Sequence, residues 1–273
     1  MTPQKYLITG GAGFIGSHTV DLLIANEHEV RVIDNLKSGN LRNLEQHKNC
    51  KKFQFHKMDL TEIEDDARVF KDIDVVIHFA GIGDIVPSID KPVDYLSNNV
   101  MGTSKILEAC RKNRIKRFIY AASSSCYGIA EVPTNENHKI DPKYPYAMSK
   151  YLGEVLAFHW ARVYGLEVNS LRIFNAYGTR SKTNGTYGAV FGVFLKQIIE
   201  NQPLTVVGNG NQLRDFVYVT DVARAFYLAG EHKTHGEIFN IGAGNPRSVS
   251  DIVKIMDKDY VSIPERPGEP IIT

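Results

Sequence analysis

The chain has 273 residues, of which 43% are hydrophobic, and a formal net charge of +1. This length is sufficient for one large domain, or for a large and a small one, each with its own core. Because 32 basic residues face 31 acidic ones, charge gives no reason to expect nucleic acid or an anionic membrane as a partner, although local arginines could bind a small anionic ligand.

Cysteine content and hydropathy bear on the compartment. Cys50, Cys110 and Cys126 are odd in number and lack the spacing of metal ligands, which disfavours a disulfide framework or a zinc site. No apolar run approaches the roughly 20 residues of a membrane span. The amino terminus enters an expected strand at Tyr6 without a signal-peptide pattern. We therefore expect a cytoplasmic protein without a metal.

Short β-branched or apolar runs alternate with helical patterns over the first two-thirds of the chain, which predicts an α/β fold with a Rossmann-type, doubly wound parallel sheet. The expected strands are Lys5–Thr9, Glu29–Ile33, Lys52–His56, Val75–Phe79, Arg117–Ala121 and Glu167–Ile173. The expected helices are Phe14–Asn26, Thr61–Phe70, Pro92–Asn113 and Tyr146–Tyr164. After Phe174 a loop rich in Gly, Ser, Thr and Asn runs through Gly188, and shorter elements follow. We interpret 1–174 as one domain and 175–273 mainly as a smaller lobe, with possible strands returning to the main sheet.

A glycine-rich segment, Thr9-Gly10-Gly11-Ala12-Gly13-Phe14-Ile15-Gly16, joins the first expected strand to the first expected helix. Gly10 and Gly13 permit a tight turn and close approach of the backbone to a pyrophosphate, while Gly16 lets the helix pack against the sheet. The start of the helix offers N–H groups and a partial positive charge to phosphates. A glycine triplet alone is equally typical of a plain tight turn, but the strand before it and the helix after it favour a dinucleotide loop.

Asp34 ends the second expected strand, where a carboxylate can accept hydrogen bonds from an adenosine ribose and repel a 2′-phosphate. This predicts NAD in preference to NADP. Lys37 and Arg42 could instead neutralise a 2′-phosphate, although solvated loop charges are the more ordinary reading. Asp59, at the end of the third strand, could contact the adenine edge or cap a helix before Thr61-Glu62, and the sequence leaves both open.

Tyr146 and Lys150 lie four residues apart and therefore on one face of an expected helix. A phenol ordinarily loses its proton near pH ~10, so a tyrosine base at neutral pH needs a nearby positive charge. An isolated Tyr-x-x-x-Lys is usually a surface pair. Here Ser123-Ser124-Ser125 follow the fifth expected strand, which places hydroxyls at the carboxyl edge of the sheet, where open α/β sheets bind ligands.

Taken in this order, the glycine loop, Asp34, the serines, Tyr146 and Lys150 resemble the extended short-chain dehydrogenase/reductase superfamily, specifically the nucleotide-sugar epimerases of the UDP-glucose 4-epimerase type. The resemblance covers nearly all of the chain. It implies an NAD-binding domain over 1–174, and a substrate-binding lobe over 175–273.

The resemblance also assigns residues. The dipeptide Tyr127-Gly128 selects Ser123 over its neighbours as the catalytic serine, beside Tyr146 and Lys150. The implied cofactor-binding residues are Gly10, Gly13, Phe14, Ile15, Gly16, Asp34, Asn35, Lys37, Ser38, Asp59, Leu60, Phe79, Ala80, Gly81, Asn99, Ala121, Tyr146, Lys150 and Phe174. His78 also matches a cofactor-lining position but could equally be a packing residue.

The implied substrate-binding residues are Ser123, Ser124, Tyr146, Asn175, Arg214, Arg266 and Thr273. Asn175 ends the motif Leu-Arg-Ile-Phe-Asn and is expected near the sugar diphosphate. Arg214, in Arg-Asp-Phe-Val-Tyr-Val, and Arg266, in Arg-Pro-Gly-Glu, are expected to bind phosphate oxygens in a bidentate manner.

The resemblance implies a reversible oxidation at the sugar 4-position. Tyr146, its pKa lowered by Lys150 and the oxidised nicotinamide, would remove the hydroxyl proton while Ser123 binds the oxygen and hydride passes to NAD. A 4-keto sugar that turns about its diphosphate would be reduced on its other face. Related dehydratases and decarboxylases carry acidic residues after the catalytic serine or threonine, whereas this chain has Ser124 and Ser125, which favours epimerisation.

UDP-glucose or UDP-N-acetylglucosamine is the expected substrate. Thr273 matches a position that gates a 2-acetamido group, and its small side chain predicts that the group is admitted. GDP and CDP sugars stay open as alternative substrates.

Family members usually continue beyond Thr273, which implies a truncated substrate lobe and leaves two alternatives: an NAD-binding homologue with weak or no catalysis, and a nucleotide-sugar reductase or dehydratase. The resemblance also implies a homodimer through the helices Pro92–Asn113 and Tyr146–Tyr164, and a role in polysaccharide biosynthesis.

Overall fold

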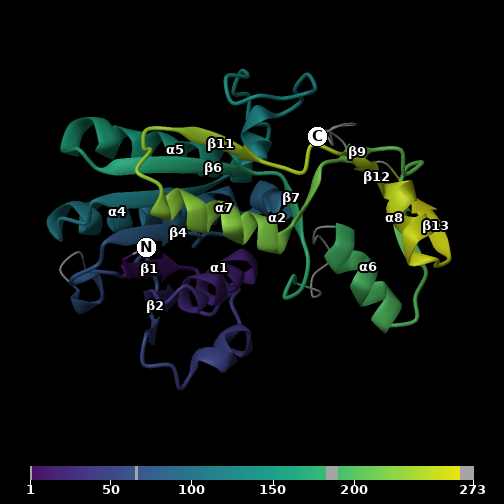
Figure 1. Cartoon of the computed structure of the whole chain (residues 1–273). Coiled ribbons are helices and arrows are strands. Elements are labelled where there is room, and N and C mark those ends of the chain that lie inside the picture. The colour runs from purple at the N-terminus through teal and green to yellow at the C-terminus, as the bar shows by residue number, and fades with distance from the viewer. Residues whose placement is uncertain (1, 65–66, 183–189, 265–273) are drawn as a thin grey trace.

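The computed structural model describes residues 2–64, 67–182 and 190–264, and its centre is a seven-stranded parallel sheet in the order β11-β6-β5-β4-β1-β2-β3 (Figure 1). The strands are β1 Lys5–Thr9, β2 Glu29–Asp34, β3 Phe53–Lys57, β4 Val75–His78, β5 Arg117–Ser123, β6 Glu167–Ile173 and β11 Ile238–Ile241. The Rossmann-type sheet is thus confirmed, and the six expected strands form with small differences at their ends. Strand order reverses between β1 and β4, and ligands of such sheets bind outside the carboxyl ends of the strands at this switch point.

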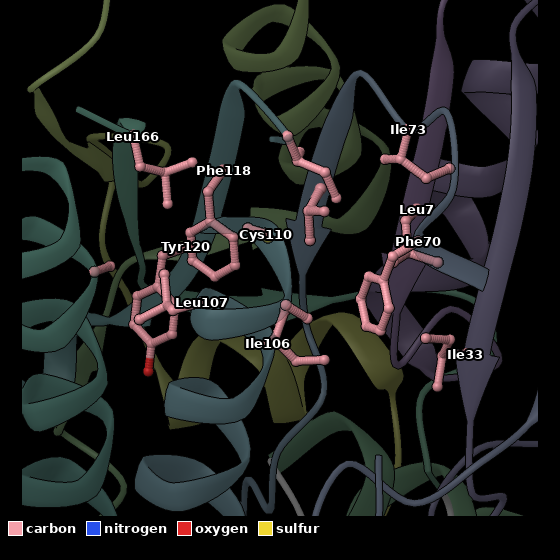
Figure 2. Close-up of a cluster of buried hydrophobic side chains, with 14 of the residues drawn as sticks. Leu7, Ile33, Phe70, Ile73, Ile106, Leu107, Cys110, Phe118, Tyr120 and Leu166 are labelled. Carbon is pink, nitrogen blue, oxygen red and sulfur yellow. The ribbon is translucent and has the colours of Figure 1, made fainter. Parts of the chain in front are cut away.

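Two layers of helices cover the sheet (Figure 1). On one face lie α4 Gly102–Lys112 and α5 Pro145–Tyr164, and on the other lie α1 Phe14–Ala25 and α7 Val219–Glu231. Alternate residues along each strand point to opposite faces. Leu7 and Phe118 therefore pack toward α4 and α5 with Ile106 and Leu107 (Figure 2), whereas their neighbours Ile8 and Ile119 belong to the core beneath α1 and α7.

Two of the expected helices form differently in the structure. The helix expected at Thr61–Phe70 is wrong, because its described residues form a turn at the start and only a short 3₁₀ helix, Arg68–Phe70. The Asp59 carboxylate accepts from the backbone N–H of Thr61 at 3.0 Å, which closes a turn. The expected helix Pro92–Asn113 is present in three parts: α3 Pro92–Tyr95, a π-helical stretch Leu96–Met101, and α4.

Sequence reasoning missed α2 Ile85–Asp90, which contains Pro87. The proline lies in the first turn of α2, where its missing N–H costs no intrahelical hydrogen bond. In the part of the chain that the structure describes, no helix is long and apolar enough to cross a membrane.

The C-terminal lobe comprises the described elements after β6 that lie outside the main sheet and α7. It contains strand pairs β7–β10, β9–β12 and β8–β13, built from β7 Asn175–Tyr177, β8 Leu204–Val207, β9 Leu213–Arg214, β10 Phe216–Tyr218, β12 Arg247–Ser248 and β13 Tyr260–Ile263. The helices α6 Val190–Ile199 and α8 Val249–Met256 enclose a third core around Phe194, Leu204 and Ile252. Since β11 and α7 return to the main sheet between parts of this lobe, the division at residue 174 stays a prediction.

Candidate functional site

The glycine-rich loop between β1 and α1 has the geometry of an anion-binding turn. Gly10 adopts a φ of +71°, which favours glycine, and a Cβ there would lie 2.7 Å from the backbone nitrogen of Ala80. A Cβ at Gly16 would collide with the carbonyl oxygen of Gly10. The N-cap of α1 is Gly13, without a side-chain cap and without an acidic residue in the first turn. The start of α1 can therefore receive a phosphate, and Phe14 and Ile15 form its first turn.

Asp34 lies at the end of β2 beside this loop and is 7% exposed. Its carboxylate accepts from the N–H groups of Ala12 at 3.0 Å and Leu36 at 2.8 Å. Burial raises the pKa of Asp34, and these two N–H donors oppose the rise. The carboxylate is thus fixed where β2 ends, as a ribose-binding residue requires, and these residues together fit an adenine dinucleotide.

Asp59 and Lys37 are paired with each other. The Nζ of Lys37 lies 2.8 Å from Oδ2 of Asp59, which also accepts from the Asn35 side chain at 2.9 Å. The Lys37 ammonium, with the Thr61 and Asn35 donors, holds the pKa of Asp59 well below its usual range. The expected cofactor residues Asn35, Lys37 and Asp59 therefore form one cluster after β2 and β3, with Ser38 exposed beside it and Leu60 buried.

The segment after β4 carries the expected cofactor residues Phe79, Ala80 and Gly81. Asn99, 1% exposed, fixes it: its Oδ1 accepts from the N–H of Ile82 at 2.7 Å, and its Nδ2 donates to the Ser149 hydroxyl at 2.9 Å. Asn99 thereby ties this segment to α5 next to Lys150.

His78 is a packing residue in this structure. It is fully buried, and its ring nitrogens lie 2.6 Å from the Thr9 hydroxyl and 2.9 Å from the Thr103 hydroxyl. Burial, together with the charge of Lys150, lowers the pKa of His78 to about 3. The imidazole is therefore neutral at physiological pH.

Ser123, Tyr146 and Lys150 come together where β5 ends and α5 begins. Tyr146 lies in the first turn of α5, its phenol hydrogen-bonds the Ser123 side chain, and Lys150 follows one turn later. The Nζ of Lys150 lies 4.6 Å from the centre of the Tyr120 ring. Ser123 also caps the 3₁₀ helix Ser124–Tyr127, with its Oγ 2.8 Å from that of Ser125.

The pKa values at this site differ from expectation. Burial raises the pKa of Tyr146, the Ser123 hydrogen bond opposes the rise, and Asp84 adds to it. Burial also lowers the pKa of Lys150 to about 8, against the opposing charge of Glu154. Desolvation is the largest cause of the Tyr146 shift, and Lys150 is not among its causes, so a lowering of this pKa by Lys150 and the oxidised nicotinamide stays a prediction.

On the substrate side, Asn175 begins β7 and Arg214 ends β9. The backbone N–H and the Nδ2 of Asn175 both donate to the carbonyl of Asp215, at 3.1 and 3.2 Å, so Asn175 adjoins the Arg214 segment. Phe174 precedes Asn175, and Ala121 lies buried in β5. Arg266 and Thr273 lie outside the described residues.

Comparison with known proteins decides the family. The model of the NAD dependent epimerase/dehydratase family matches residues 6–242. A putative UDP-glucose 4-epimerase of Methanocaldococcus jannaschii is 42% identical over 253 residues, which cover 92% of this chain and 80% of that protein. The chain belongs to the NAD dependent epimerase/dehydratase family.

Solved structures of this family have the same fold. The UDP-N-acetylglucosamine 4-epimerase of Methanobrevibacter ruminantium M1, in complex with UDP-N-acetylmuramic acid, superposes with a TM-score of 0.95 at 33% identity, covering 100% of this chain and 89% of that one. The UDP-glucuronic acid 4-epimerase of Bacillus cereus, in complex with UDP-glucuronic acid and NAD, gives 0.91 at 33% identity, with 98% and 89% covered. The predicted family and its dependence on NAD are confirmed.

Sequence reasoning missed a buried polar network behind the site of this epimerase/dehydratase family member. Glu154, one turn after Lys150 on α5, forms an ion pair with Arg172 of β6 at 2.6 Å. Arg172 also donates to the Tyr127 hydroxyl at 2.8 Å, and Tyr127 donates to Oδ1 of Asn240 at 2.7 Å. The sequence signal was a charged residue, Arg172, within a strand expected in the core of the sheet, because a buried charge requires a partner.

Proposed function

We propose that the chain is an NAD-dependent nucleotide-sugar 4-epimerase, an isomerase acting on a UDP-hexose, either UDP-glucose or UDP-N-acetylglucosamine. The observation that carries the proposal is the meeting of Ser123, at the carboxyl end of β5, with Tyr146 and Lys150 at the start of α5, on the sheet edge that also carries the glycine loop and Asp34. Serines at 124 and 125, where the family's dehydratases carry acids, support epimerisation without elimination.

Tyr146 is the proposed base for the sugar 4-hydroxyl. Its side chain is partly buried and its phenol is hydrogen-bonded to Ser123, so the substrate oxygen would replace or share that hydrogen bond. Because burial raises the pKa of Tyr146, proton removal depends on positive charge nearby, and the buried Lys150 supplies it while protonated. Bound NAD supplies the acceptor and donor of hydride.

Retention of the diphosphate is assigned to Asn175, Arg214 and Arg266. Arg214 and Asn175 belong to adjoining segments at the carboxyl edge, which supports a shared anion site. A fixed diphosphate lets the oxidised sugar present its other face, so that Tyr146 returns the proton to an inverted hydroxyl. Thr273 would admit a 2-acetamido group.

The direct test is to incubate purified protein with UDP-glucose or UDP-N-acetylglucosamine and to look for the 4-epimer by NMR, without added NADH. Product formed without net NADH change supports the epimerase. Firmly bound NAD with no product from either sugar favours the NAD-binding homologue, and a keto or reduced product favours the dehydratase or reductase.

We also infer a homodimer through α4 and α5. Large apolar side chains are exposed on and beside these helices: Met101 is 58%, Met148 41% and Val155 44% exposed. Light scattering after size exclusion should give twice the monomer mass, and Val155→Asp should lower the measured mass.

The unpaired Cys50, Cys110 and Cys126 fit a reducing compartment such as the cytoplasm, where polysaccharide precursors are made.

A further inference from the structure

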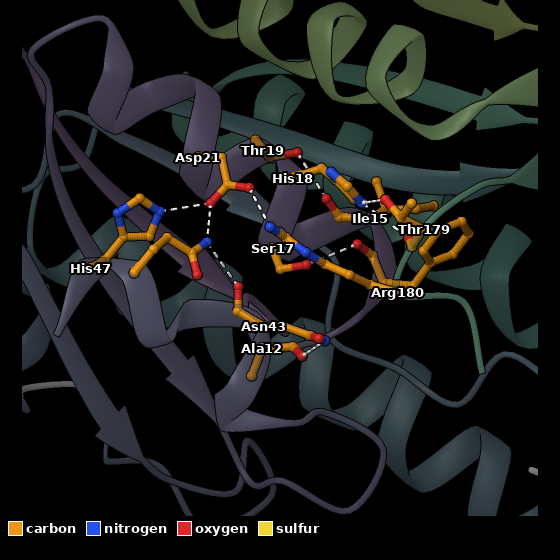
Figure 3. Close-up of polar contacts among 12 residues, drawn as sticks. Ala12, Ile15, Ser17, His18, Thr19, Asp21, Asn43, His47, Thr179 and Arg180 are labelled. Carbon is orange, nitrogen blue, oxygen red and sulfur yellow. Dashed lines mark hydrogen bonds and ion pairs between the residues drawn. The ribbon is translucent and has the colours of Figure 1, made fainter. Parts of the chain in front are cut away.

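Asp21, on the second turn of α1, connects three parts of the chain through one carboxylate (Figure 3). Its Oδ1 lies 2.6 Å from Nε2 of His47 and 2.7 Å from Nε2 of Gln46, both at the end of the 3₁₀ helix Leu41–His47. Its Oδ2 lies 2.8 Å from Nη2 of Arg180, in the segment that follows β7. The helix that begins at the glycine loop is thus joined to the segment after Asp34 and to the segment after Asn175.

Both segments also contact the start of α1 directly. The Nδ2 of Asn43 donates to the carbonyl of Ala12, in the glycine loop, at 3.0 Å. On the other side, Nε2 of His18 lies 3.0 Å from the carbonyl of Thr179, and the His18 ring packs edge-on against Phe14. The segment after Asp34 therefore contacts the glycine loop at Ala12, and the segment after Asn175 contacts the first turns of α1 at His18 (Figure 3).

Arg180 adopts this position at a cost. Its φ is +67°, a left-handed conformation that is unfavourable for a residue with a Cβ. Its Nη1 is buried without a hydrogen-bond partner among the described residues. Among the described residues this guanidinium is paired with Asp21, so loss of the carboxylate charge favours release of the segment.

We propose that Asp21 is a positioning residue that fastens these two segments across the cofactor loop and slows the loss of NAD. The inference deepens the proposed function, because an epimerase must keep its cofactor between the two hydride transfers. An exposed ion pair alone contributes little, but this carboxylate accepts from three side chains of two segments and couples them.

The test measures NAD release without any sugar. NAD-loaded protein is diluted into alcohol dehydrogenase and excess ethanol, which convert released NAD into NADH that is followed by absorbance. We expect Asp21→Asn to release NAD about tenfold faster than the parent, a change equivalent to about 1.4 kcal/mol. Arg180→Met should give a similar acceleration, and the double variant should release no faster than Asp21→Asn, because both changes remove the same contact.

Glu45→Gln is the matched control. Glu45 lies in the same 3₁₀ helix, and its exposed carboxylate pairs with Lys48 at 3.3 Å, so this variant should keep the parent rate. The melting temperature of each NAD-free variant separates a local effect from general destabilisation.

Three results would overturn the inference: release from Asp21→Asn at the parent rate, additive acceleration in the double variant, or acceleration that follows a fall in the NAD-free melting temperature. The proposed function is tested separately. Fast NAD release from Asp21→Asn in a protein that converts no sugar would support the role of Asp21 and contradict the epimerase.

Discussion

Glu154 and Arg172 form a buried ion pair with two hydrogen bonds, from Nη2 of Arg172 to Oε1 at 2.6 Å and from Nε to Oε2 at 3.0 Å. Both side chains are 4% exposed or less. The pair joins α5 to β6, and Glu154 lies one turn beyond Lys150. The position of α5 on the sheet therefore depends on a contact that includes no proposed catalytic residue.

Replacing Glu154 by Gln should destabilise the fold by about 3–5 kcal/mol, because it leaves the Arg172 guanidinium buried without its counter-charge. Urea denaturation measures this change. Glu108→Gln is the control: Glu108 pairs with Arg111 on the surface of α4, and its loss should cost less than about 1 kcal/mol. Equal free energies of unfolding for the two variants would show that the buried ion pair stabilises the fold no more than the surface pair.

Tyr146→Phe should lower kcat by at least about 100-fold, since it removes the proposed proton acceptor and keeps the ring. NAD binding and the melting temperature should change little. Tyr164→Phe on the same helix, 50% exposed, serves as the control and should keep full activity. Unchanged turnover in Tyr146→Phe would exclude Tyr146 as the base.

Asp34→Ala should weaken NAD binding by about tenfold, because an acceptor for the ribose hydroxyls is lost. It should weaken NADP binding less, since the charge that repels a 2′-phosphate is gone as well. Isothermal titration with each dinucleotide gives the ratio of the two dissociation constants. A ratio equal to that of the parent would contradict the assignment of Asp34 to the ribose.

Stability should fall on acidification through the buried His78. Its folded pKa of about 3 lies below the ordinary histidine value of 6.5, so between these pH values the unfolded chain binds a proton that the folded chain does not. The free energy of unfolding therefore decreases as pH falls from about 6.5 toward 3, and the contribution is fully present above this window. Urea denaturation at several pH values between 3 and 6.5 measures this change, and the free energy of unfolding should depend less steeply on pH in His78→Gln than in the parent. An identical dependence in both proteins would contradict this role.

The sequence predicted the features that repeat along the chain. The six expected strands follow from alternation of apolar runs, and the glycine spacing located the turn before α1. It failed where one side chain determines the local structure: Asp59 closes a turn at Thr61 in place of the expected helix. It also missed contacts between distant residues, such as Glu154 with Arg172, because spacing carries no information about which buried charges meet. The raised pKa of Tyr146 likewise depends on burial, which no motif displays.

The path of the chain limits how the molecule can move. After β6 the chain enters the C-terminal lobe, returns to the sheet through α7 and β11, and leaves again before β12. Three crossings hold the lobe to the sheet, whereas a hinge between domains ordinarily relies on one or two flexible connections. Closure around a sugar should therefore be a small shearing displacement of packed elements, without a wide swing of one half against the other.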